Sequence, residues 1–67
     1  MQNLEELRDQ TTAVLSELIL LSPDSIQDLM AASLAVEKQA GEACALAFTY
    51  QTALTQITKT KLQKALS

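Results

Sequence analysis

Residues 20–30 read LLSPDSIQDLM and place the chain's one proline between two stretches of helical pattern. Proline costs about 3 kcal/mol inside a helix but almost nothing at the first helical position, where its missing N–H would be unpaired anyway. Ser22 is a good N-cap, and Asp24 carries a negative charge that suits a first helical turn. Proline also disfavours the helical conformation at the residue before it. These signals predict that one helix ends at Leu21, that residues 22–24 form a turn, and that a second helix begins near Asp24.

The apolar residues before this turn recur in steps of three and four, which is a heptad pattern. Asn3 precedes the pattern as a candidate N-cap, with Glu5 and Glu6 in the first turn where carboxylates suit the positive helix end. The sequence therefore predicts a first helix over residues 3–21. Its seam consists of Leu4, Leu7, Thr11, Val14, Leu18 and Leu21, with Thr11 as a polar interruption.

After the turn the same steps resume and predict one long helix over about residues 24–65. The middle of this second seam is made of small side chains, which would allow a facing backbone to approach closely. The sequence leaves open whether the helix continues through Gly41, because glycine costs only up to about 1 kcal/mol in a helix interior. The seam consists of Leu29, Ser33, Val36, Ala40, Ala43, Ala47, Tyr50, Leu54 and Ile57.

A link of two to four residues joins helices that fold back on one another. The predicted fold is therefore all-α, a single antiparallel helical hairpin domain over residues 1–67. At about 1.5 Å per residue the first helix spans roughly 28 Å and the second roughly 62 Å. We expect the first helix to shield residues 25–43. The apolar residues from Cys44 to Leu66 must then be covered by another chain, or by a fold-back at Gly41 that makes a three-helix bundle.

The uncovered part of the second helix is the candidate partner-binding surface. Phe48 and Tyr50 are the chain's only aromatic residues, and both fall in this part. Large aromatic side chains are good anchors in a partner's groove, although packing inside a self-associated bundle explains them equally well. The residues that we expect to contact a partner are Val36, Ala40, Ala43, Ala47, Phe48, Tyr50, Leu54 and Ile57.

Composition excludes several classes of function. The chain has no histidine and a single glycine, so it can form neither a Ser-His or Cys-His catalytic pair nor a glycine-rich phosphate loop. The i,i+4 acid pairs Glu5 with Asp9 and Asp24 with Asp28 lie near helix starts, where acids are favoured without any metal. We expect no enzyme activity, no cofactor and no metal site.

Charge is divided along the chain. Residues 1–42 hold all eight acids and two basic residues, a net charge of −6, whereas residues 43–67 hold three lysines and no acid, a net charge of +3. Such a chain lacks the basic field and the stacking surface that nucleic-acid binding needs. The start of the chain has no apolar run of the kind found in signal peptides, and the densest run, residues 18–21, is too short to span a bilayer. We expect a soluble cytoplasmic protein that binds neither nucleic acid nor membrane.

Two features of the C-terminal half have competing interpretations. Threonines recur every third residue at Thr49, Thr52, Thr55 and Thr58. They predict either a neutral solvated helix face or a segment that frays when free and becomes ordered when docked. Cys44 lies among alanines, and we expect it to be a small buried hydrophobic residue and not a reactive thiol.

Several short patterns along the chain match one known family: NLEEL at residues 3–7, Pro23 followed by Ile26 and Gln27, the Ala-Val-Glu step at residues 35–37, and the aromatic position Tyr50. Together they resemble the E-type co-chaperones of type III secretion needles, which are chains of about this length. The resemblance covers roughly residues 3–50. It implies a helical hairpin that packs against a tetratricopeptide-like chaperone and stabilises it, so that the pair holds the needle subunit monomeric in the cytoplasm. It would make this chain a component of protein transport in virulence.

The second hypothesis is a self-assembling helical subunit. The needle subunit is itself a small two-helix hairpin with a proline-containing turn, and a homo-oligomeric bundle would cover the same apolar surface. The two hypotheses share a protein partner and differ in whether that partner is another protein or a second copy of this chain.

Overall fold

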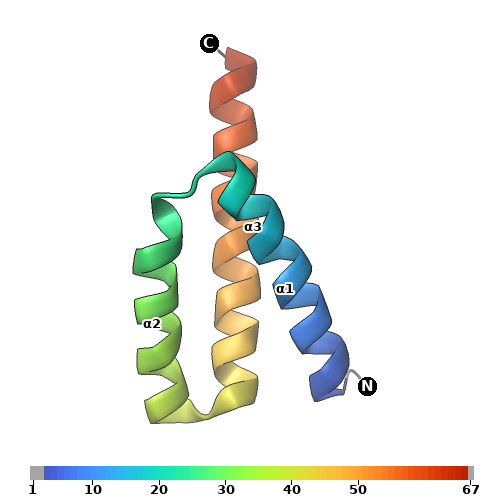
Figure 1. The fold of residues 1–67 in the computed structure, drawn as a ribbon, viewed down its shortest axis with the longest axis vertical. Coiled ribbons are helices and arrows are strands. Elements are labelled where there is room, and N and C mark those ends of the chain that lie inside the picture. The colour runs from blue at the N-terminus through green and yellow to red at the C-terminus, as the bar shows by residue number, and fades with distance from the viewer. Residues whose placement is uncertain (1–2, 67) are drawn as a thin grey trace.

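The computed structural model describes residues 3–66, which form three helices: α1 (Leu4–Leu21), α2 (Ser25–Ala40) and α3 (Glu42–Leu66) (Figure 1). No strand occurs over these residues. The longest helix, α3, runs along the long dimension of the molecule, which measures 39 Å. The prediction of an all-α fold is confirmed, whereas the two-helix hairpin is matched only in part: the long second helix is divided at Gly41, the break that the sequence left open, and the chain forms three helices.

The turn at residues 22–24 lies where the proline pattern predicted it. The Ser22 amide donates to the Leu18 carbonyl at 2.7 Å and closes α1, and the Ser25 amide donates to the Ser22 carbonyl at 3.1 Å and opens α2. The Ser22 hydroxyl lies 2.9 Å from the Ser25 hydroxyl, so it does not make the backbone capping bond expected of it. At the start of α1, Asn3 does cap as predicted, because its side-chain oxygen accepts the Glu6 amide at 2.8 Å.

Gly41 breaks the predicted long helix into α2 and α3. Its φ of 93° and ψ of 171° lie in a region that is open almost only to glycine. The Gly41 amide donates to the Glu37 carbonyl at 2.9 Å, and the Gly41 carbonyl accepts the Ala45 amide at 3.1 Å. One residue thus ends α2 and starts α3, and the chain folds back at the position that the sequence left open.

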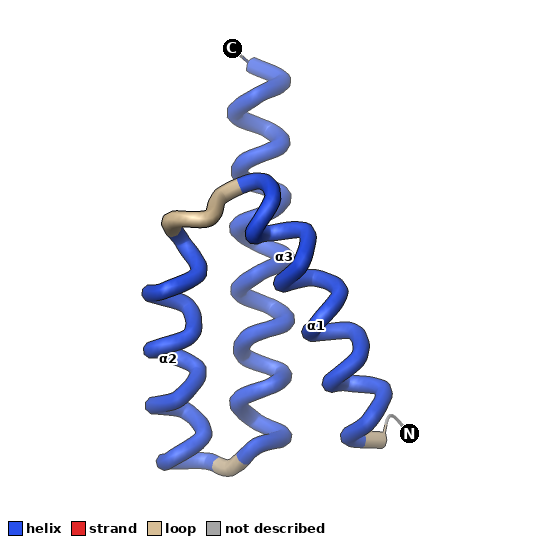
Figure 2. The backbone as a smooth tube through the Cα atoms, viewed as in Figure 1, coloured by secondary structure: helices blue, strands red, loops and turns tan. Residues whose placement is uncertain are grey.

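The fold-back places α3 between the other two helices. α1 and α2 each pack extensively against α3 and contact each other much less (Figure 2). Arg8 pairs with Glu42 near the starts of α1 and α3, and Glu17 pairs with Lys61 near their ends, so these two helices run parallel. The expectation that the first helix shields residues 25–43 is wrong. α1 instead packs mainly on α3. The turn at Gly41 folds the chain back, so that the buried side of α3 lies against the apolar seam of α1.

The core is small and is built around the face of α3. Leu18 and Ala53 are completely buried, and Leu29 and Ile57 nearly so, with Phe48 packed against them. The α1 seam is confirmed, since Thr11 and Leu18 are its buried residues. In α3 the buried positions recur every fourth residue instead of following the predicted seam. They are Ala45, Thr49, Ala53 and Ile57.

A buried pair of hydroxyls joins α2 to α3. The Thr49 hydroxyl donates to the Ala45 carbonyl at 2.7 Å and is also hydrogen-bonded to the Ser33 hydroxyl. Because a hydroxyl has a single hydrogen, Ser33 must be the donor to Thr49. Thr49 is therefore buried, contrary to the prediction of a solvated threonine face, whereas Thr52, Thr55 and Thr58 are exposed as that interpretation required.

The conformation of Gly41 predicts opposite effects for the two mirror forms of alanine. A Cβ at Gly41 would meet no atom within 4 Å, so the effect of Gly41→Ala is confined to the backbone. We expect L-alanine to lower the free energy of unfolding by about 1–3 kcal/mol through strain. D-alanine fits a positive φ and should raise it by about 0.4–1 kcal/mol. Urea unfolding of the synthetic proteins measures both effects, and a stabilising L-alanine would instead indicate one continuous long helix.

The direction of the Ser33–Thr49 hydrogen bond predicts an asymmetry between two substitutions. Thr49→Val removes the acceptor of a buried hydroxyl and should lower the free energy of unfolding by about 1–3 kcal/mol. Ser33→Ala leaves Thr49 bonded to the Ala45 carbonyl and should cost less. The double variant should be more stable than Thr49→Val alone, because no hydroxyl is left without a partner. Equal costs for the two single variants, with simple addition in the double, would contradict the assigned direction.

Candidate functional site

An apolar groove lies between α1 and α2 over the start of α3. α1 and α2 diverge from the turn that joins them (Figures 1 and 2), and the groove has a volume of about 160 Å³. We call it the α1–α2 groove. Its walls include Thr11 and Leu15 of α1 and Met30, Leu34 and Glu37 of α2, and its floor includes Leu46 of α3.

Polar contacts hold α1 in register over the floor of the groove. The Thr11 hydroxyl donates to the Leu7 carbonyl at 2.7 Å and lies 3.4 Å from the Leu46 carbonyl. The Arg8 Nε donates to the Glu42 carboxylate at 2.9 Å. Exposed pairs of this kind contribute only about 0–1 kcal/mol, so the Arg8–Glu42 pair aligns the two helix starts more than it stabilises them.

The walls of the groove leave large apolar side chains in contact with solvent. Met30 and Leu34 are exposed on α2, four residues apart and therefore neighbours on one side of the helix. Met30 and Leu34 were not among the predicted contact residues, because the predicted hairpin placed the first helix over this part of the chain. Their positions directly after Leu29 and Ser33 of the predicted seam, at the same spacing of four, could have indicated a second apolar side of the helix.

A second apolar surface follows the outward side of α3. Four of the residues predicted to bind a partner are spaced by four, three and four positions and so share one face of the helix, which is not the buried face. We call them the outer strip: Ala43, Ala47, Tyr50 and Leu54, of which Tyr50 is half-buried and the others are exposed. Farther along α3, Leu54, Thr58 and Leu62 line a shallow hollow.

The structure distributes the other four predicted contact residues elsewhere. Ala40 is exposed at the end of α2, and Val36 and Phe48 are half-buried. Ile57 is part of the core with Leu18 and Leu29, so the prediction that it awaits a partner is wrong. The reason is that the packed face of α3 passes through Ile57 once the chain folds back at Gly41.

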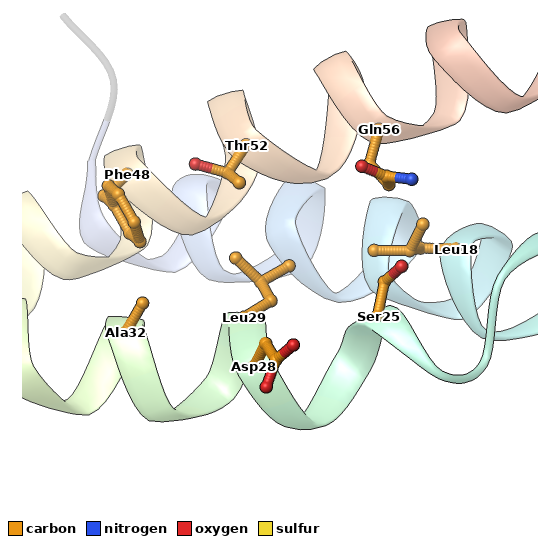
Figure 3. Close-up of a pocket in the computed structure, with 8 residues that line it drawn as sticks. All are labelled: Leu18, Ser25, Asp28, Leu29, Ala32, Phe48, Thr52 and Gln56. Atoms are coloured by element: carbon orange, nitrogen blue, oxygen red, sulfur yellow. The ribbon is translucent and has the colours of Figure 1, made fainter.

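A third hollow, of about 280 Å³, lies between α2 and α3 (Figure 3). Leu29 and Ala32 of α2 face Phe48 and Thr52 of α3 across it, with Leu18 of α1 behind. Its polar rim is Ser25, Asp28, Thr52 and Gln56. Asp28 is the one charged side chain in this lining.

Residues 3–66 contain no group of three histidine, cysteine, aspartate or glutamate side chains placed to hold a metal ion. Over the same residues, none of the three helices combines the length and the apolar character that crossing a bilayer requires.

Cys44 is exposed, and the expectation that it is buried is wrong. It lies in the first turn of α3, next to the buried Ala45. The break at Gly41 sets the rotation of α3 so that Ala45 faces α1 and α2 while the side chain before it faces outward.

No protein-family model matches this chain, and no curated protein or solved structure shows significant similarity to it.

The exposure of Cys44 predicts its reactivity. A disulfide reagent such as dithionitrobenzoate should modify Cys44 completely in the folded protein, at a rate that denaturant changes little. The matched control is the double variant Cys44→Ala/Ala45→Cys, whose thiol should be protected until the chain unfolds because Ala45 is buried. Protection of Cys44 in the wild-type protein, released only by denaturant, would show that α3 presents a different face.

Proposed function

We propose that this chain is a non-catalytic helical protein that binds a second protein through the outer strip of α3. The observation that carries the proposal is the absence of charge along an exposed helix face. No charged residue occurs between Glu42 and Lys59, which is more than about four helical turns. Three of the four outer-strip residues in this stretch are exposed.

A solvated helix face normally carries charged or strongly polar side chains. The outer strip instead combines two alanines with Tyr50 and Leu54. Small side chains allow a partner helix to approach closely, and the larger ones can enter a pocket on its surface. A neutral, apolar helix face of this kind is suited to helix-on-helix docking.

The resemblance to E-type needle co-chaperones supplies the candidate partner. We propose a tetratricopeptide-like chaperone, whose surfaces are helical, with the secretion needle subunit as the client of the resulting pair in the cytoplasm. The break at Gly41 departs from the two-helix hairpin that this resemblance implies. The proposal therefore depends on the outer strip and on the matching sequence patterns and not on the fold.

Co-expression with a tetratricopeptide-like chaperone tests this proposal. We expect a stable complex that survives size-exclusion chromatography, and Leu54→Glu should weaken it by roughly 30-fold or more, since it charges a central apolar contact. Leu20→Glu is the matched control: Leu20 is 84% exposed at the end of α1, outside the outer strip. Tyr50→Ala should also weaken the complex.

Two results would contradict the proposal. One is the absence of any complex with the chaperone. The other is a complex that Leu54→Glu and Tyr50→Ala leave as tight as the wild type, while circular dichroism shows that both variants keep their helices.

A further inference from the structure

The α1–α2 groove lies where a fourth helix would pack in a four-helix bundle. α3 contacts both other helices, whereas α1 and α2 diverge on one side of it and leave a trough between them. Four-helix bundles fill such a trough with a helix that covers both walls. Here Leu34 remains 57% exposed on one wall, and Leu15 of the other wall is half-buried.

The end of α3 is exposed to solvent on all sides. Every residue from 61 to 66 is exposed, and the helix projects beyond the turn that joins α1 to α2 (Figure 1). Leu62 is 59% exposed and Leu66 is 80% exposed. They lie four residues apart and therefore form one apolar side of this projecting helix.

The charges of the groove and of the projecting helix are opposite. Among residues 3–66, Lys59 and Lys64 make no ion pair, whereas Lys61 binds the Glu17 carboxylate at 2.9 Å. The groove is lined by Glu37 and contains no lysine or arginine. The start of α1, at the end of the molecule where α1 and α2 lie farthest apart (Figure 1), adds further acids at Glu5 and Glu6.

We propose that residues 58–66 of one copy of this chain occupy the α1–α2 groove of a second copy. Leu66 and Leu62 would face Met30 and Leu34, and Lys59, which shares their side of the helix, would lie toward Glu37. Residues 58–66 are about 13 Å long as a helix, and the groove wall from Met30 to Glu37 is about 11 Å, so the lengths agree.

The segment cannot fill the groove of its own chain. The floor of the groove is formed by residues 45–49 near the start of α3, while the segment is the end of the same continuous helix. A contact between two different surfaces is heterologous, so each added copy leaves one groove and one segment free. The chain should then associate head to tail, to an extent that rises with concentration and falls with salt.

This interaction goes beyond the proposed binding of a chaperone: it uses the α1–α2 groove and the end of α3, although Leu62 of the segment shares a shallow hollow with Leu54 of the outer strip. Two substitutions at exposed positions alter the two contacting surfaces separately: Leu34→Glu changes the groove, and Leu62→Glu changes the segment. We expect light scattering after size-exclusion chromatography to show wild-type masses that rise above the 7.3 kDa of one chain as concentration increases. Each variant alone should remain at the mass of one chain, and Leu20→Glu should assemble like the wild type.

Mixing the two variants is the decisive measurement. The Leu34→Glu variant has an intact segment, which can enter the intact groove of the Leu62→Glu variant. The two surfaces left over in that pair, the groove of Leu34→Glu and the segment of Leu62→Glu, are both altered and can bind no further copy. We expect an equimolar mixture to form a dimer that grows no further.

Other outcomes overturn the proposal. They are a wild-type chain that stays monomeric at millimolar concentration, variants that still assemble, or a mixture that stays monomeric. Assembly that is lost in Leu54→Glu but kept in Leu34→Glu and Leu62→Glu would assign self-association to the outer strip. Chaperone binding should be unchanged in Leu34→Glu, which lies on α2 away from the outer strip, so failure of either proposal is distinguishable from failure of the other.

Discussion

The backbone conformation of Gly41 is the constraint on which the rest of this structure depends. With φ at 93°, the chain leaves α2 and re-enters a helix after a single residue. That one step reverses the direction of the chain and sets the rotation of α3 about its own axis. The rotation decides which residues of α3 face the other helices and which face outward. The core, the groove and the outer strip are all consequences of it.

The core that results is stabilised by the close approach of α3 to α1 and α2 more than by the burial of large side chains. Ala45 and Ala53 on α3 bring its backbone near α1 and α2, and Leu18 and Leu29 fill the space between. The buried hydroxyls of Ser33 and Thr49 satisfy each other and the Ala45 carbonyl, so their burial leaves no polar group without a partner. A core of this size in so short a chain supplies little stability, and burial of a further apolar surface against another protein would add to it.

Two apolar surfaces remain exposed for different reasons. The outer strip is exposed because α3 is uncharged on all sides from residue 43 to residue 58 but packs against only two other helices. The α1–α2 groove is exposed because α1 and α2 meet α3 instead of each other. The first surface is a convex helix face suited to docking on another protein. The second is a concave trough lined by Met30, Leu34 and Glu37, for which we propose the projecting end of α3 from a second copy as the occupant.

Local sequence determined the parts of this fold whose signals lie within one helical turn. Asn3 caps α1, and the Ser-Pro-Asp step makes the turn at residues 22–24, because capping and the restricted φ of proline act on neighbouring atoms. The seam of α1 was predictable for the same reason. The shared face of Ala43, Ala47 and Leu54 was also predictable, since spacing inside one helix does not depend on what packs against it.

Only the tertiary structure decided the break at Gly41 and everything that follows from it. A glycine inside a helix costs about 1 kcal/mol, which is too little for local energetics to choose between continuing and breaking. The choice depends on burying Ala53 and Ile57 against Leu18, a contact between residues more than thirty positions apart in sequence. For that reason the burial of Thr49, the exposure of Cys44 and the opening of the α1–α2 groove became visible only when the three helices were placed together.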